Sequence, residues 1–144
     1  MAAELDALEP ALVWRYFLEL AAIPRPSGHE ERAAAWLVAE ARALGLEVER
    51  DTVGNVLIRK PASPGCEGAP AVAMQAHIDM VCEKNEDTVH DFATDPIRVR
   101  RDGEVLRATG TTLGADDGIG VAAGLAALAD PSLVHPALEL LVTM

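Results

Sequence analysis

Two apolar runs constrain the fold of this chain most, because each is long enough for a strand and its apolar side chains favour burial. Residues 71–81 (AVAMQAHIDMV) are apolar on both alternating faces, which predicts a central strand covered by helices. Residues 137–144 (ALELLVTM) predict a second buried strand. Between them, residues 116–129 (DDGIGVAAGLAALA) predict a helix whose glycines and alanines allow close packing against a sheet.

Four further segments carry the pattern of a regular element: two amphipathic helices, residues 10–22 and 30–44, and two antiparallel strand pairs, residues 46–60 and 97–108. Ser27 and Glu30 have the spacing of a capping box that starts the second helix, and Gly45 suits its C-terminal cap. Asp102 and Gly103 are typical of a hairpin tip. This order of elements predicts a three-layer α/β domain around a mixed sheet.

The charge and the cysteine content exclude several classes of protein. The 144 residues are enough for about one domain. The chain has 12 basic and 23 acidic residues, a net charge of −11, which argues against nucleic acid and against an anionic membrane surface as partners. Cys66 and Cys82 match neither a disulfide framework nor a zinc ribbon, so a reducing cytoplasm is expected. The sequence stops within a predicted core strand, at Met144, so we expect it to be the N-terminal part of a longer protein.

The first candidate for chemistry is the pair His77 and Asp79 at the end of the first apolar run. In a strand, residues two apart point to the same face, so these side chains would lie side by side and Ile78 would point away. Ligands bind at the carboxyl ends of strands in open α/β sheets. The pair is therefore either a structural hydrogen bond or a metal ligand with its partner.

The second candidate is the glycine- and threonine-rich segment at residues 109–120 (TGTTLGADDGIG). One aspartate at a helix start is explained by capping, whereas Asp116 and Asp117 together indicate a tight loop that presents carboxylates. A phosphate-binding loop would need a Lys-Ser/Thr pair, and an EF-hand would need alternating oxygen ligands and a closing glutamate. Combined with His77, this segment is consistent with half of a two-metal site that contains a bridging carboxylate.

Three motifs in this order resemble the cytosolic zinc dipeptidases of the aminoacyl-histidine (Xaa-His) type, also called cytosol non-specific dipeptidases. The motifs are AHIDMV (76–81), NEDTVHDF (85–92) and TTLGADDGIG (111–120), and PRPSGHEE and DTVGNVLIRKPA fit the same family. The resemblance implies that residues 1–144 form the N-terminal part of a zinc-peptidase-like catalytic domain. It also implies hydrolysis of dipeptides, Xaa-His and broader, by metal-activated water in a cytoplasmic enzyme. The substrate would be a small peptide, the cofactor two zinc ions, with manganese or cobalt as alternatives, and the full-length protein a homodimer.

The resemblance also implies roles for four residues. His77 would ligate one zinc ion, Asp116 would bridge the two ions, Asp79 would be the catalytic-site residue that orients His77, and Asp117 would support the site. In the family a Glu-Glu pair follows the run that ends here at Met144 and supplies the general base and a ligand. We therefore expect the 144-residue chain alone to be inactive. His90 and Cys82 receive no role.

Two other interpretations remain open at this point. The same scaffold serves related tripeptidases and aminoacylases, and the tripeptidases share a segment similar to residues 111–117. The chain could also be a non-catalytic α/β remnant, whose exposed strand edge would favour self-association.

Overall fold

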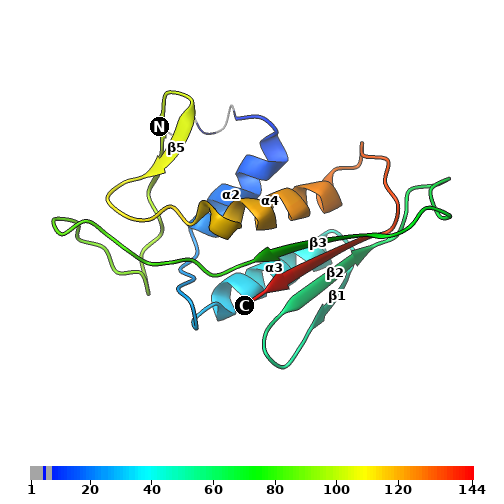
Figure 1. Ribbon diagram of the computed structural model, residues 1–144, viewed down its shortest axis with the longest axis horizontal. Helices are drawn as coiled ribbons and strands as arrows, with labels where there is room; N and C mark the ends of the chain where they lie inside the picture. The colour runs from blue at the N-terminus through cyan, green and yellow to red at the C-terminus, as the bar shows by residue number, and fades with distance from the viewer. Residues whose placement is uncertain (1–4, 6–7) are drawn as a thin grey trace.

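The computed structural model of the chain describes residue 5 and residues 8–144 (Figure 1). Of the expected catalytic-domain segment 1–144, residues 1–4 and 6–7 therefore lie outside the described part. The helices are α2 (Ala11–Ala21), α3 (Glu31–Ala43) and α4 (Ala115–Ala129), and the strands are β1 (Glu47–Arg50), β2 (Val56–Lys60), β3 (Val72–His77), β4 (Val99–Asp102), β5 (Val105–Ala108) and β6 (Leu138–Thr143).

Four of the strands form one mixed sheet in the order β1-β2-β6-β3. β2 pairs antiparallel with both β1 and β6, whereas β3 runs parallel to β6. β4 and β5 form a separate hairpin that lies away from the main sheet, on the side of α2 (Figure 1). The mixed α/β sheet and both antiparallel pairs confirm the predictions. The strand at the C-terminal end of the chain, β6, lies between β2 and β3 in the sheet.

The strand register shows that the three helices cover one face of the sheet. Ile58 is paired with Leu140, and Leu140 with Met74, so these side chains share a face. Ile58 and Leu140 are fully buried, and one apolar cluster joins them to buried residues of α2, α3 and α4. On the opposite face Leu141 keeps 37% of its surface exposed and Gln75 is exposed. The described residues therefore form two of the three predicted layers.

β3 differs from its prediction as a central strand covered on both faces. It is an edge strand of this sheet, and Val72, Ala73 and Gln75 are exposed. A run of apolar residues indicates that a strand is suited to burial, but it does not specify which segment covers it. In the described part of the chain, α4 covers only the face that carries Ala76.

The helix boundaries agree with the predictions except at the starts of α3 and α4. Gly45 follows α3 with φ of +71°, the left-handed conformation that glycine adopts readily at a helix end. The capping box is wrong, because Glu30 is the N-terminal cap residue of α3 and makes no side-chain capping bond. The Ser27 hydroxyl instead donates a hydrogen bond to Asp79, beyond the end of β3.

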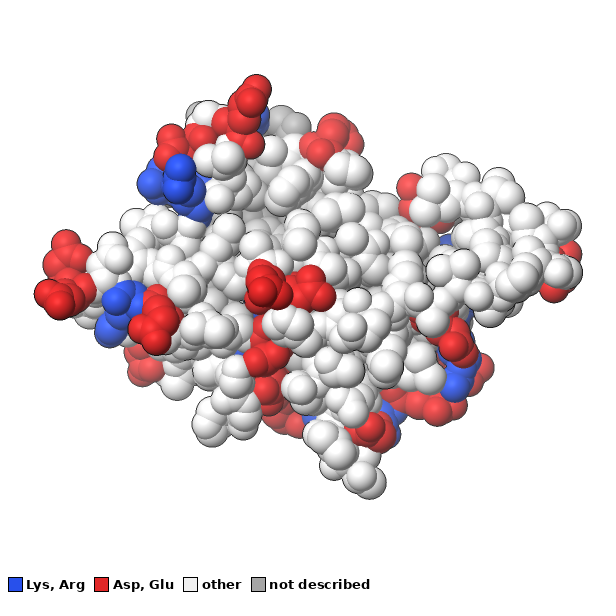
Figure 2. All heavy atoms as spheres, in the orientation of Figure 1, with Lys and Arg blue, Asp and Glu red and all other residues white. Residues whose placement is uncertain are grey.

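Acidic side chains form several separate groups on the face seen in Figure 2, with few basic side chains between them. On the open face of the sheet, Arg59 forms ion pairs with Glu47, Glu49 and Glu139. None of the helices in the described part of the chain is both long and apolar enough to cross a membrane.

Candidate functional site

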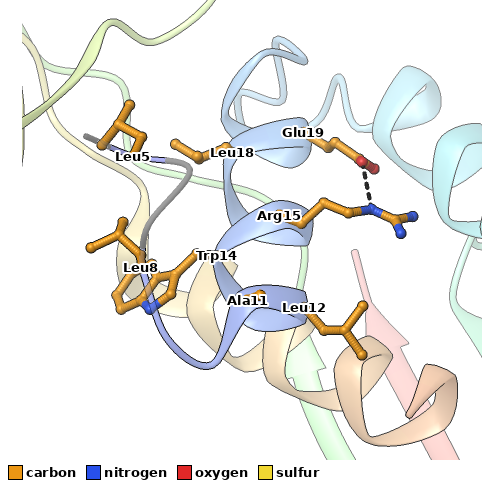
Figure 3. Close-up of a pocket in the computed structure, with 8 residues that line it drawn as sticks. All are labelled: Leu5, Leu8, Ala11, Leu12, Trp14, Arg15, Leu18 and Glu19. Carbon is orange, nitrogen blue, oxygen red and sulfur yellow. Dashed lines mark hydrogen bonds and ion pairs between the residues drawn. The ribbon is translucent and has the colours of Figure 1, made fainter. Parts of the chain in front are cut away.

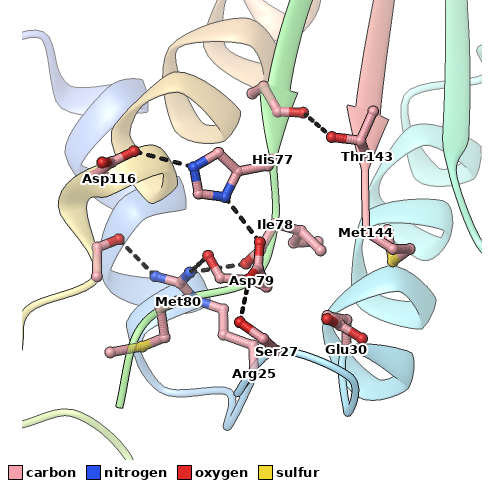
Figure 4. Close-up of polar contacts among 12 residues, drawn as sticks. Arg25, Ser27, Glu30, His77, Ile78, Asp79, Met80, Asp116, Thr143 and Met144 are labelled. Atoms are coloured by element: carbon pink, nitrogen blue, oxygen red, sulfur yellow. Dashed lines mark hydrogen bonds and ion pairs between the residues drawn. The ribbon is translucent and has the colours of Figure 1, made fainter. Parts of the chain in front are cut away.

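The candidate site begins where β3 ends. His77 and Asp79 lie on the same side of the chain, with His77 Nδ1 2.9 Å from Asp79 Oδ1. Ile78 points the other way and is fully buried in the core. The alternation predicted from the sequence is therefore confirmed, and burial of Ile78 holds the two polar side chains at the surface of the strand end (Figure 4).

Asp116 reaches the same imidazole from the start of α4. Its Oδ1 lies 3.0 Å from His77 Nε2, so His77 stands between two carboxylates (Figure 4). The Asp116 side chain is 96% exposed, which leaves it accessible to a ligand. The chain reaches this position through Gly114, whose φ of +73° makes a turn just before α4.

Asp116 and Asp117 do not cap the helix. Gly114 is the N-terminal cap residue of α4, and no side chain caps it. Both aspartates have non-helical backbone angles and are joined by a cis peptide bond, so regular helix begins only after Asp117. The Asp117 carboxylate lies against Gly120, where a Cβ atom would fall 2.4 Å from Asp117 Oδ1. The predicted helix start at Asp116 is corrected accordingly.

The contacts of this cluster set its charge. Burial alone would lower the pKa of the His77 imidazole, but the hydrogen bonds to Asp116 and Asp79 outweigh it, so the pKa lies above its ordinary value of 6.5. The Ser27 hydroxyl and then His77 hold the pKa of Asp79 below its ordinary value of 3.8, against the effect of burial. Asp79 is therefore an ionised carboxylate at neutral pH, and each of its oxygens already accepts a hydrogen bond.

Sequence reasoning missed two residues that contact the site, Ser27 and Arg25. Ser27 donates to Asp79 Oδ2, and the buried Arg25 donates to backbone carbonyls on both sides of the site. Both lie in the segment between α2 and α3, where the sequence predicted only a capping box at Ser27. Pro24 and Pro26 on either side of Arg25 were the available signal, because they hold this segment extended.

The other histidines do not join the site. His29 is exposed in the turn before α3, and the imidazole of His135 contacts the carbonyl of Pro136. His90, which received no role from the sequence, lies in a loop and is only 8% exposed. Its ring packs edge-on against Phe92, with ring centroids 4.5 Å apart, and its Nε2 has no hydrogen-bond partner among the described residues.

The donor atoms of His77 and Asp116 fit part of a zinc site. Two donors at about 2.1 Å from a tetrahedral zinc ion lie about 3.4 Å apart. The observed 3.0 Å between Nε2 and Oδ1 is within a small side-chain rotation of that value. Within the described residues, no set of three or more His, Cys, Asp or Glu side chains converges on one position. A complete zinc site therefore needs at least one further donor.

An apolar hollow of about 390 Å³ lies elsewhere, on the surface of α2 (Figure 3). Leu5, Leu8 and residues of α2 line it, and its charged side chains, Arg15 and Glu19, are paired with each other. It shares no residue with the cluster around His77. We therefore place the candidate site at the end of β3 and not in this hollow.

No protein-family model matches the chain. A curated sequence does match: the chain is 54% identical, over 142 residues that make up 99% of it, to the cytosol non-specific dipeptidase of Escherichia coli (strain K12). Almost the whole chain is therefore similar to a cytosol non-specific dipeptidase. The chain spans 29% of the length of this dipeptidase.

A solved structure supports the same resemblance. The aminoacylhistidine dipeptidase from Vibrio alginolyticus superposes with a TM-score of 0.94 at 49% identity, over 99% of this chain and 30% of its own. A tripeptidase from Staphylococcus aureus matches with a TM-score of 0.74 at 23% identity, over 92% of this chain and 36% of its own. A dinuclear metal-binding peptidase of the M20 family from Bacillus subtilis matches with a TM-score of 0.54 at 16% identity, over 90% and 34%. The latter two show a shared fold alone.

Proposed function

We propose that the chain forms part of a metal-dependent dipeptidase catalytic domain that hydrolyses small peptides, Xaa-His dipeptides among them. The observation that carries the proposal is the position of the His77 imidazole between Asp79 on Nδ1 and Asp116 on Nε2. The 54% identity to a dipeptidase over nearly the whole chain supports it. The lower identity to the tripeptidase, 23%, favours dipeptides over tripeptides.

In this proposal each side chain has a separate task. Asp79 accepts the Nδ1–H of His77, which selects the tautomer whose Nε2 lone pair faces outward. Nε2 and the exposed carboxylate of Asp116 are then the donors for a metal. A bound zinc ion would supply Lewis acidity and a water of lowered pKa. Manganese and cobalt are alternatives, since imidazole and carboxylate donors also suit them.

Asp79 acts through His77 and not as a metal ligand, because both of its oxygens are occupied by Ser27 and His77. Asp117 supports the turn from its position against Gly120. The described residues offer two donors, whereas a zinc site takes three or four protein ligands. We therefore propose that hydrolysis needs residues beyond these 144, which would complete the catalytic domain and carry a domain for homodimerisation. A cytoplasmic location is part of the proposal, and the name of the Escherichia coli relative supports it.

The test uses the complete protein and its Asp116→Asn variant. An amide keeps the size of the side chain but loses the negative charge that a bridging ligand supplies. Hydrolysis of Xaa-His dipeptides should fall below detection, and bound metal measured by elemental analysis should fall with it. Asp102→Asn, at the exposed β4–β5 hairpin, is the matched control and should retain both. Near-wild-type turnover by Asp116→Asn would refute the assignment.

The same assays separate the other interpretations. Tripeptides or N-acyl amino acids hydrolysed in place of dipeptides would assign the scaffold to a related peptidase. A complete protein that folds without metal and hydrolyses none of these would be a non-catalytic remnant. Hydrolysis by the isolated 144-residue chain would contradict the proposal that further donors are required.

A further inference from the structure

Arg25 is a buried cation next to the candidate site. Its side chain is 1% exposed, although it lies in an extended segment between two helices. The segment is joined to the chain just after β3. The Met80 amide donates to the Arg25 carbonyl at 3.1 Å, and Pro26 and Met80 form an isolated parallel β-bridge. The guanidinium is therefore held directly behind the strand end that carries His77 and Asp79 (Figure 4).

The two ends of the guanidinium contact two different parts of the candidate site. Nη1 donates to the carbonyl of Ile78 at 2.8 Å and to that of Asp79 at 3.3 Å. Nη2 donates to the carbonyl of Gly114 at 2.7 Å, two residues before Asp116. Arg25 thus links the end of β3 to the turn that opens α4, the two segments whose separation sets the distance between His77 Nε2 and Asp116 Oδ1.

The glycines beside the two aspartates make room for this link. A Cβ atom at Gly114 would fall 2.5 Å from Arg25 Nη2, and one at Gly118 would fall 2.8 Å from it. Any side chain at either position would push the guanidinium away. The close approach of Arg25 is therefore a structural reason for glycine at positions 114 and 118.

Arg25 is not explained by an ion pair. It makes no ion pair within the described part of the chain, and its Nε has no hydrogen-bond partner there. Burial lowers the pKa of Arg25 to about 10 and outweighs the opposite effect of the Asp79 charge, so the group is still a cation at neutral pH. A buried cation that makes no direct ion pair costs free energy, which an apolar side chain of similar length would not. The planar guanidinium, unlike an apolar side chain, can donate to the carbonyls of Ile78 and Gly114 at the same time.

We propose that Arg25 is a positioning residue, which holds the end of β3 and the Gly114 turn together so that His77 and Asp116 face one metal position. That a metal binds between His77 and Asp116 rests on the proposed function. The effect of Arg25 on the distance between these two side chains does not depend on a metal, and it is measured separately.

The experiment compares four variants of the complete protein: Arg25→Met, Arg25→Lys, Gly118→Ala and Leu37→Ala. The first removes the fork, the second keeps the charge without the fork, and the third displaces Nη2 through the Cβ atom. Leu37 is fully buried in α3, so Leu37→Ala destabilises the fold without touching the link. The readouts are the zinc dissociation constant, by competition with a chromophoric chelator, and the Nε2–Oδ1 distance in crystals of the metal-free proteins.

Arg25→Met and Arg25→Lys should weaken zinc binding by about 10- to 100-fold, the usual effect of losing a group that orients a ligand. The Nε2–Oδ1 distance should change by more than about 0.5 Å, the tolerance of a well-ordered site. Gly118→Ala should move both readouts in the same direction and provides the test if the Arg25 variants do not fold. Leu37→Ala should leave both unchanged.

Three results would overturn the proposal: an unchanged distance in Arg25→Met or Gly118→Ala, wild-type behaviour of Arg25→Lys, or an equal change in Leu37→Ala. If the wild-type protein binds no zinc, the proposed function fails, and the distances alone decide the role of Arg25.

Discussion

Replacing Gly124 by alanine tests how closely α4 packs on the sheet, and therefore what fixes the helix that carries Asp116. The added Cβ atom would fall 2.6 Å from Leu140 Cδ1 and 2.9 Å from Cδ2, where ordinary contacts are 3.4–4 Å. Leu140 is fully buried in β6, the strand between β2 and β3, and has little space into which to move. The substitution therefore overpacks the core.

Two opposing effects set the magnitude. Overpacking a well-packed core costs about 1–3 kcal/mol. Alanine is favoured over glycine inside a helix by about 1 kcal/mol. The net effect of Gly124→Ala is then a loss of about 0–2 kcal/mol in the free energy of unfolding. In a Leu140→Ala background the clash is absent, so Gly124→Ala should stabilise the protein by about 1 kcal/mol. The two results differ by a coupling energy of about 1–3 kcal/mol.

The assay is urea unfolding of the four proteins in this cycle, followed by far-ultraviolet circular dichroism. Ala123 is exposed on the same helix, so Ala123→Gly calibrates the difference in helix propensity and should cost about 1 kcal/mol in both backgrounds. If Gly124→Ala has the same effect in both backgrounds within about 0.5 kcal/mol, the reasoning from close packing is wrong.

Two further predictions concern carboxylates. Asp79→Asn in the complete protein should lower metal affinity or activity about 10- to 100-fold, because a neutral amide holds the Nδ1–H of His77 less firmly than a carboxylate does. Metal titration measures the affinity, and an unchanged value would contradict the orienting role of Asp79. Asp51 accepts the amides of Val53, Gly54 and Asn55 between β1 and β2, and its pKa is lowered, chiefly by the Asn55 side chain. Its contribution to stability should be complete above its ordinary pKa of 3.8 and lost as the pH falls through the lowered folded-state pKa. The difference in Tm between the wild type and Asp51→Ala should therefore shrink on acidification, and a difference that grows would contradict the assignment.

The sequence by itself determined the features that depend on the spacing of neighbouring residues. Alternation along a strand was enough to put His77 and Asp79 on one side and Ile78 on the other, because a strand repeats every two residues. The left-handed Gly45 at the end of α3 followed from its position just after an amphipathic run. The proximity of His77 and Asp116, 39 residues apart, was anticipated by combining two motifs with a family resemblance, and the structure brings them to 3.0 Å.

Only the tertiary structure decided which partner each polar group has. Ser27 has the spacing of a helix cap, yet its hydroxyl bonds Asp79, 52 residues away. Arg25 bonds the carbonyl of Gly114 across 89 residues. β3 reads as a central strand but lies at the sheet edge. Local periodicity reports how suited a segment is to burial or to a turn, whereas the choice among several possible partners depends on which distant segments the whole fold brings together.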